Sequence, residues 1–65
     1  MHKGILLNVL EYYCFDNVHK DSLKDIFRYI STEYKIEPAE IEKTFQECVT
    51  EGRIRYVEAQ KRYYF

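Results

Sequence analysis

The chain has 65 residues, of which 46% are hydrophobic and 17% aromatic, and its formal net charge is −1. A chain of this length forms one domain at most, and its stability is expected to be marginal because it buries a small fraction of its surface. The hydrophobic content excludes a disordered chain, and no apolar run approaches the roughly 18 residues of a membrane-spanning helix. We therefore expect a single cytoplasmic domain over residues 1–65, with no membrane partner.

The small net charge hides a segregation of charge along the chain. Residues 1–36 hold five basic and five acidic side chains, whereas residues 37–51 hold one lysine and five glutamates. Residues 52–65 hold four basic side chains and one glutamate. The sequence therefore joins an acidic segment to a basic C-terminal tail.

The first predicted helix covers residues 3–14, because its apolar residues recur with the i, i+3, i+4, i+7 spacing of one helical face. Its stripe consists of Leu6, Val9, Leu10 and Tyr13, and Ile5 and Tyr12 widen it. An Asp-Asn turn then breaks this period. Val18 follows the turn and can add one short extended pairing.

A second helix is predicted over residues 22–34, since Asp21 and Ser22 are good N-cap residues. Its apolar stripe consists of Leu23, Ile26, Phe27, Ile30 and Tyr34. Lys35 and Ile36 form the connector to the next helix, without a glycine to tighten the turn.

The third predicted helix covers residues 38–51. Pro38 occupies the first helical position, where proline is best tolerated, and Glu40 suits the dipole of the first turn. The inward face consists of Ile41, Phe45, Cys48 and Val49. Gly52 follows as the expected left-handed terminator.

After Gly52 the sequence pattern changes from a period of about 3.6 to about 2. Residues 53–57 alternate and are β-prone, and residues 62–65 are β-prone again, so we predict two strands. Glu58 to Lys61 form the turn, which predicts a hairpin with a loop of three to five residues. The last strand is a candidate for an unpaired sheet edge.

The order of helix, short break, two helices and hairpin resembles the winged helix-turn-helix family over nearly the whole chain. The most specific part is Ile41-x3-Phe45-x2-Cys48-Val49-x2-Gly52-x-Ile54, followed by Tyr63-x-Phe65. It is similar to the family's recognition helix, glycine and first wing strand. The resemblance implies a mainly α fold of three helices with a small β-hairpin in α/β/α/α/β/β order. It also implies double-stranded DNA as partner, with the third helix in the major groove and the wing against the backbone or minor groove.

The chain departs from the family pattern because its third helix is acidic and its second helix is longer than usual. At 100° per residue, the strip opposite the apolar face of the third helix is nearly free of acid. It consists of Ala39, Lys43, Gln46 and Thr50. Lys43 can donate to guanine acceptors or phosphate, Gln46 can bridge an adenine edge, and the small residues can touch a thymine methyl. Glu47 flanks this strip and opposes phosphate binding.

Basic residues of the tail are predicted to supply the contacts to the DNA backbone. They are Arg53, Arg55, Lys61 and Arg62, with Lys20, Lys24, Arg28 and Lys35 around the second helix as weaker candidates. The aromatic residues of the tail can stack on bases or, more commonly, belong to the core or a dimer surface. These aromatic residues are Tyr56, Tyr63, Tyr64 and Phe65.

No catalytic or metal-binding pattern is present. The sequence has no Gly-rich phosphate loop, nucleophile–base pair or convergent carboxylate pair, so no enzyme activity is expected. Cys14, Cys48, His2 and His19 lack the spacing of a zinc site, and no cofactor is expected. We expect core cysteines and surface histidines, with a disulfide as the alternative in an oxidising host.

Two functions follow from the sequence. The favoured one is a small DNA-binding transcription regulator, acting as a homodimer whose third helices read half-sites about one turn apart. The alternative is a protein–protein interaction module, an adaptor or inhibitor, which the five glutamates around the third helix and the aromatic C-terminus favour.

Overall fold

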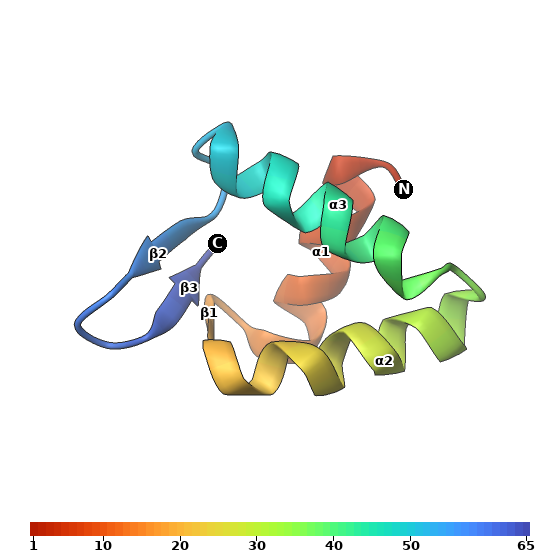
Figure 1. Ribbon diagram of the computed structural model, residues 1–65, viewed down its shortest axis with the longest axis horizontal. Helices are drawn as coiled ribbons and strands as arrows, with labels where there is room; N and C mark the ends of the chain where they lie inside the picture. The colour runs from red at the N-terminus through yellow and green to blue at the C-terminus, as the bar shows by residue number, and fades with distance from the viewer.

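The chain forms three helices and a small antiparallel sheet that lies beyond one end of the helices (Figure 1). The computed structural model describes all 65 residues. The elements are α1 (Lys3–Cys14), β1 (Asn17–His19), the 3-10 turn η1 (Lys20–Ser22), α2 (Leu23–Tyr34), α3 (Pro38–Thr50), β2 (Arg55–Val57) and β3 (Arg62–Tyr64). A mainly helical fold with a C-terminal hairpin is confirmed: the bounds of α1 are as predicted, and the other elements differ from the prediction by at most two residues at either end. No helix has both the length and the apolar character needed to cross a membrane.

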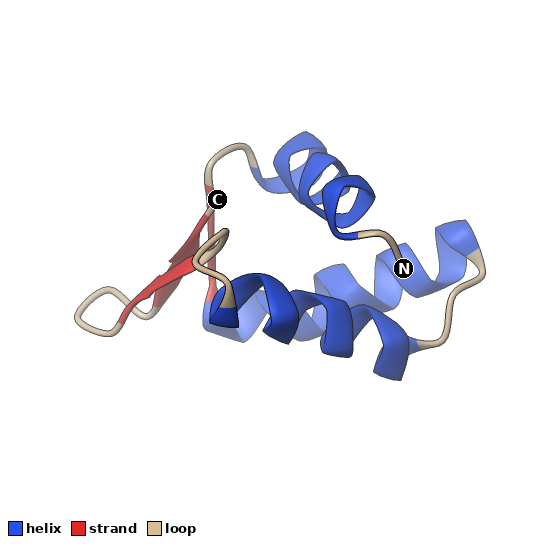
Figure 2. Ribbon diagram, turned by 90° about the horizontal axis from the view of Figure 1, so that it is seen from above, coloured by secondary structure: helices blue, strands red, loops and turns tan.

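The helix α3 packs against both α1 and α2, and the view from above shows the strands standing apart at the end where α3 finishes (Figure 2). The core contains side chains from all three helices and from the start of the hairpin. Its members are Leu6, Val9, Leu10, Ile30, Ile41, Phe45, Cys48 and Ile54. Because α3 supplies three of these eight residues, its orientation in the fold is determined by core packing.

The ring of Phe45 holds three elements together. Its centroid lies 5.2 Å from that of Phe27 in α2 and 5.0 Å from that of Tyr63 in β3, both in edge-to-face geometry. Phe45 is completely buried. Edge-to-face pairs add to the stabilisation from burial alone, so the hairpin is attached to the helices through α3.

Two predicted apolar stripes are narrower in the structure. Ile5 and Tyr12 were expected to widen the stripe of α1, but both are exposed, as is Tyr34 at the end of α2. These predictions were wrong because a helix buries only the residues that another element covers, and no element covers these three. α3 instead buries Thr44, which the sequence pattern did not include, and its hydroxyl donates to the carbonyl oxygen of Glu40 at 2.9 Å.

Both histidines cap helical turns. The Nδ1 atom of His2 accepts a hydrogen bond from the backbone N–H of Gly4 at 3.1 Å, at the start of α1. His19 Nδ1 accepts from the N–H of Asp21 at 3.1 Å, at the start of η1. Ser22, a predicted N-cap, makes no capping bond, because as the last residue of η1 it has helical backbone angles (φ −88°, ψ −13°), whereas a capping residue is typically extended.

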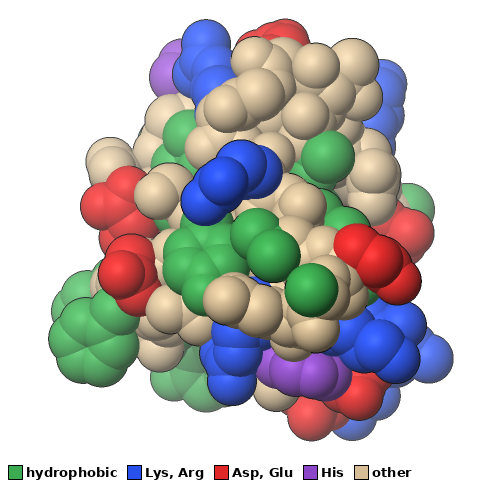
Figure 3. Space-filling view, turned by 90° about the vertical axis from the view of Figure 1, so that its left-hand side faces the viewer, with side chains coloured by type: hydrophobic (Ala, Val, Ile, Leu, Met, Phe, Trp, Pro, Cys, Tyr) green, Lys and Arg blue, Asp and Glu red, His purple; other side chains and the backbone are tan.

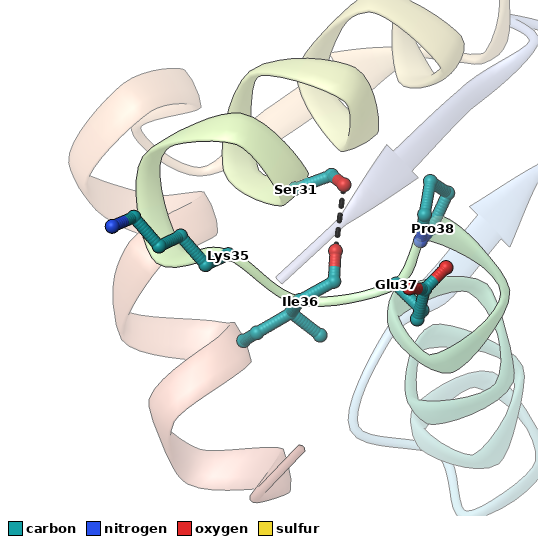
Figure 4. Close-up of a pocket in the computed structure, with 5 residues that line it drawn as sticks. All are labelled: Ser31, Lys35, Ile36, Glu37 and Pro38. Carbon is teal, nitrogen blue, oxygen red and sulfur yellow. Dashed lines mark hydrogen bonds between the residues drawn. The ribbon is translucent and has the colours of Figure 1, made fainter.

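The connector between α2 and α3 turns without glycine (Figure 4). Lys35 takes the left-handed conformation, with φ 54°, and ends α2. The hydroxyl of Ser31 then donates to the carbonyl oxygen of Ile36 at 2.6 Å, and the N–H of Ile36 donates back to the Ser31 carbonyl at 3.2 Å. This pair of bonds fixes the position of Pro38, the first residue of α3.

The sheet has the strand order β1-β3-β2, so the last strand is central. The prediction that it forms an unpaired edge was wrong, because β1 pairs with its second side. Val18, which was expected to allow one short pairing, lies opposite Tyr63 and is buried. The predicted left-handed Gly52 is confirmed with φ 81°, and residues 58–61 form the loop of the hairpin.

Candidate nucleic-acid interface

The outward strip of α3 is exposed to solvent. Ala39, Lys43, Gln46 and Thr50 are all exposed. The buried residues of the same helix lie on its opposite side, since Ile41, Phe45 and Cys48 have no exposed surface. No ion pair or hydrogen bond within the chain engages the side chains of Lys43 and Gln46. The strip therefore offers a free cation and a free amide, the groups that contact bases and phosphates in a major groove.

Two of the glutamates beside this strip are neutralised within the chain. The N-terminal ammonium of Met1 lies 3.0 Å from a carboxylate oxygen of Glu40. Glu51 accepts from the ammonium of Lys3 and lies 3.2 Å from Nε of Arg53. The hydrogen bond from Lys3 lowers the pKa of Glu51, and the same contact raises the pKa of Lys3. The helix is thus less acidic than its composition indicates, because cations distant in sequence lie beside it.

Glu42 and Glu47 remain exposed and without an ion-pair partner. Glu47 precedes the buried Cys48 and flanks the outward strip, as helical spacing predicts. Of the glutamates of α3, Glu47 is therefore the one whose carboxylate would most directly repel a phosphate that approaches the strip.

The four basic residues of the tail have different environments. Arg53 is paired with Glu51, and the Nη1 atom of Arg62 donates to Oδ1 of Asn17 at 2.8 Å, which ties β3 to β1. The guanidinium of Arg55 lies 5.8 Å from the ring centroid of Tyr64 and is exposed. Lys61 extends from the hairpin loop without an ion-pair partner in the chain. Arg55 and Lys61 are therefore the cations most available to a ligand.

Strand register places most of the polar side chains of the sheet on its outer face. Arg55, Tyr64 and Asn17 form one row across the three strands, and Val57, Arg62 and His19 form the next. Successive residues of a strand point to opposite faces, so the row of Val18, Tyr63 and Tyr56 lies on the other face. At this end of the molecule, Lys and Arg side chains lie among hydrophobic ones, with acidic groups toward the margins (Figure 3).

The aromatic residues of the tail are largely committed to packing. Tyr63 and Phe65 pack against the core cluster, and the ring centroid of Tyr56 lies 4.6 Å from that of Tyr63. The hydroxyl of Tyr64 donates to the side chain of Gln60. The core interpretation of Tyr63 and Phe65 is confirmed.

Cations of η1 and α2 lie beside α3. Lys20 and Lys24 line a hollow of about 250 Å³ together with Gln46 and Glu42 of α3. Lys24 and Arg28 line an adjacent hollow of about 330 Å³, again with Glu42. The spacing of four residues between Lys24 and Arg28 is a sequence signal for one face of α2, and this face borders the groove between α2 and α3.

The cysteines are free thiols, and no group of three or more His, Cys, Asp or Glu side chains is arranged to hold a metal ion. Cys48 is a core residue, as expected, whereas Cys14 is only half-buried. Burial raises the pKa of both thiols. Both are therefore poor nucleophiles at neutral pH.

Comparisons of the chain with protein-family models, with curated proteins and with solved structures find no match.

Proposed function

We propose that the chain is a winged helix-turn-helix domain that binds double-stranded DNA, with α3 in the major groove and the hairpin as the wing. The observation that carries this proposal is the outward strip of α3, where Lys43 and Gln46 are exposed and uncommitted on a helix otherwise bounded by acid. The pairing of the short strand after α1 with the hairpin also supports it, because small winged domains often have such a strand.

Cations surround this strip on two sides. Arg55 and Lys61 extend from the hairpin that follows the C-terminal end of α3, and Lys20 and Lys24 lie across the groove from Gln46. In this proposal Lys43 and Gln46 contact base edges, and the surrounding cations contact phosphates. A small DNA-binding domain of this kind would act as a transcription regulator.

The role of a protein-interaction module is the second candidate. The observation that favours it is the pair of unneutralised glutamates, Glu42 and Glu47, on the exposed side of α3. An unpaired edge of the last strand would also have favoured this role. However, β3 is the central strand, so it has no free edge to which a partner could add a strand.

The test is a fluorescence titration of a short labelled duplex at low and at physiological salt. We expect Lys43→Ala and Arg55→Ala each to weaken binding by about 1 kcal/mol or more, and Arg55→Ala to reduce the salt slope by about one. Glu47→Gln should tighten binding at low salt, by about 1 kcal/mol if the carboxylate lies about 4 Å from a phosphate in water. Glu11→Gln, an exposed change of the same chemistry on α1, is the matched control and should leave the affinity unchanged.

The comparison of Glu47→Gln with Glu11→Gln separates a contact at α3 from a general effect of net charge, because each variant removes one negative charge. Absence of binding by the wild-type protein at low salt contradicts the proposal. Equal affinities for wild type, Lys43→Ala and Glu47→Gln contradict the assignment of α3 as the contacting helix.

A further inference from the structure

Every large hydrophobic side chain that the chain leaves exposed lies on α1, on the residue after it, or on α2. These residues are Ile5 (53% exposed), Tyr12 (80%), Phe15 (83%), Tyr29 (51%) and Tyr34 (46%). None lies on α3 or in the sheet. Single exposed hydrophobic residues are ordinary, but their concentration on one part of a surface marks an interaction site.

Three of the aromatic rings form a continuous row from α1 to α2. The ring centroids of Tyr12 and Tyr13 are 5.0 Å apart, and those of Tyr13 and Tyr29 are also 5.0 Å apart. Ile5 lies seven residues before Tyr12, so it is on the same side of α1. We call the surface formed by Ile5, Tyr12, Tyr13 and Tyr29 the aromatic face.

The aromatic face is turned away from α3. Lys3 of α1 pairs with Glu51 at the end of α3, and Tyr12 points about 180° from Lys3 at 100° per residue. Phe27 of α2 packs on Phe45 of α3, and Tyr29 points about 200° from Phe27. A partner on the aromatic face would therefore leave the outward strip of α3 uncovered.

The charges beside Tyr29 are self-complementary. Asp25, Arg28, Tyr29 and Thr32 line a shallow hollow of about 280 Å³ on the outer side of α2. Asp25 and Arg28 are exposed and have no ion-pair partner within the chain. In a contact about a two-fold axis, residue i of one copy meets residue j of the other and j meets i. Asp25 and Arg28 can thus form two reciprocal pairs between two copies of this chain.

The area also fits a second copy. At about 200 Å² for each complete large side chain, the three exposed members of the aromatic face, Ile5, Tyr12 and Tyr29, present on the order of 370 Å². A stable interface needs about 800 Å² from each partner, so these three residues provide about half of that share, and the exposed Asp25 and Arg28 beside Tyr29 add to it. A net charge of −1 adds little repulsion between copies.

We propose that the aromatic face binds a second copy of the same chain, with α2 packed antiparallel on α2 of that copy and Asp25 of each facing Arg28 of the other. A two-fold axis that lies in the interface turns one copy by 180° relative to the other. The outward strips of the two α3 helices therefore face in opposite directions. This arrangement replaces the expected reading of two half-sites on one face of a duplex. The dimer does not depend on DNA binding, but one consequence rests on the proposed function: the dimer joins two separate duplex segments.

Sedimentation of the purified protein tests the dimer. We expect the wild type to be dimeric, and Tyr29→Ser to be monomeric with an unchanged helical circular dichroism spectrum. Asp25→Arg and Arg28→Asp should each weaken the dimer by about tenfold or more, because each creates two like-charge contacts. The double variant Asp25→Arg/Arg28→Asp should restore the dimer.

Glu58→Arg, a charge reversal in the hairpin loop away from α1 and α2, is the matched control and should leave the dimer unchanged. A wild type that stays monomeric at the highest soluble concentration overturns the proposal. So does a dimer that is indifferent to both Tyr29→Ser and Asp25→Arg, because it must use another surface.

Energy transfer between two duplexes, one carrying a donor and one an acceptor, tests the direction of the α3 helices. Wild-type protein should produce transfer, whereas Asp25→Arg should bind a single duplex without producing it. Dimers that bind DNA without transfer overturn the arrangement with α3 helices facing apart. If no variant binds either duplex, the proposed function fails, and sedimentation still decides whether the dimer exists.

Discussion

Four residues with positive φ mark the places where the chain changes direction, and only one of them is a glycine. Phe15, Lys35 and Lys61 take φ values of 63°, 54° and 54°, whereas Gly52 has φ 81°. Left-handed backbone is strained for residues with a Cβ atom, so the packing of the elements on either side must hold these turns. Of the four, only Gly52 can be recognised from its residue type.

Ionisation of the Tyr13 hydroxyl is expected to lower the stability of the fold at alkaline pH. Burial, followed by its hydrogen bond with Tyr29, raises the pKa of Tyr13 from 10.0 to about 12. The unfolded chain ionises this hydroxyl at lower pH than the folded chain, so the stabilisation is complete below about pH 10 and is lost as the pH rises to about 12. We expect Tyr13→Phe to lose less stability than the wild type across this interval. Urea unfolding of both proteins at several pH values from 9 to about 12 measures the difference, and parallel losses would contradict the assignment.

Among the elements, α3 has two different surfaces on opposite sides. Its inner side contacts both other helices and, through Phe45 and Tyr63, the central strand. Its outer side carries the strip proposed to contact DNA. Because the inner contacts determine the rotation of the helix about its axis, they also determine which residues face a ligand.

Replacement of Phe45 should therefore affect the helices and the hairpin together. Phe45→Ala is expected to cost about 3–5 kcal/mol, because it leaves a cavity where α2, α3 and β3 meet. A small domain has a total stability of about 5–15 kcal/mol, so most of the fold should be lost at moderate temperature. Phe45→Leu, which keeps more of the volume, should cost under about 1.5 kcal/mol and remain folded. Thermal unfolding followed by circular dichroism distinguishes the two, and similar midpoints would contradict this role.

At the scale of the whole molecule, the surface has two opposed faces. The strip of α3 and the free cations of the hairpin are polar, whereas the exposed apolar residues lie on α1 and α2. Only 10 of the 65 residues are buried within one copy. Association through the aromatic face would thus add a substantial part of the apolar burial that a chain of this length otherwise lacks.

The unfolding temperature should consequently rise with protein concentration. Dimerisation stabilises the folded chain by mass action, so a hundredfold increase in concentration shifts the midpoint upward only if the folded chain associates. We expect this shift for the wild type and its absence for Asp25→Arg. Calorimetry at several concentrations measures it, and a wild-type midpoint that is independent of concentration would contradict the dimer.

The amino-acid sequence by itself determined the helices, the hairpin and the outward strip of α3. Each depends on the spacing of neighbouring residues, such as the apolar period before Gly52 and the alternation after it, and these local patterns act before the chain folds. Only the tertiary structure decided the central position of β3, the bond between Arg62 and Asn17, and the pairing of Glu51 with Lys3. It also decided that Ile5 and Tyr12 stay exposed, since a helical face is buried only where another element covers it. These outcomes require contacts between residues far apart in the sequence, and no local pattern specifies such contacts.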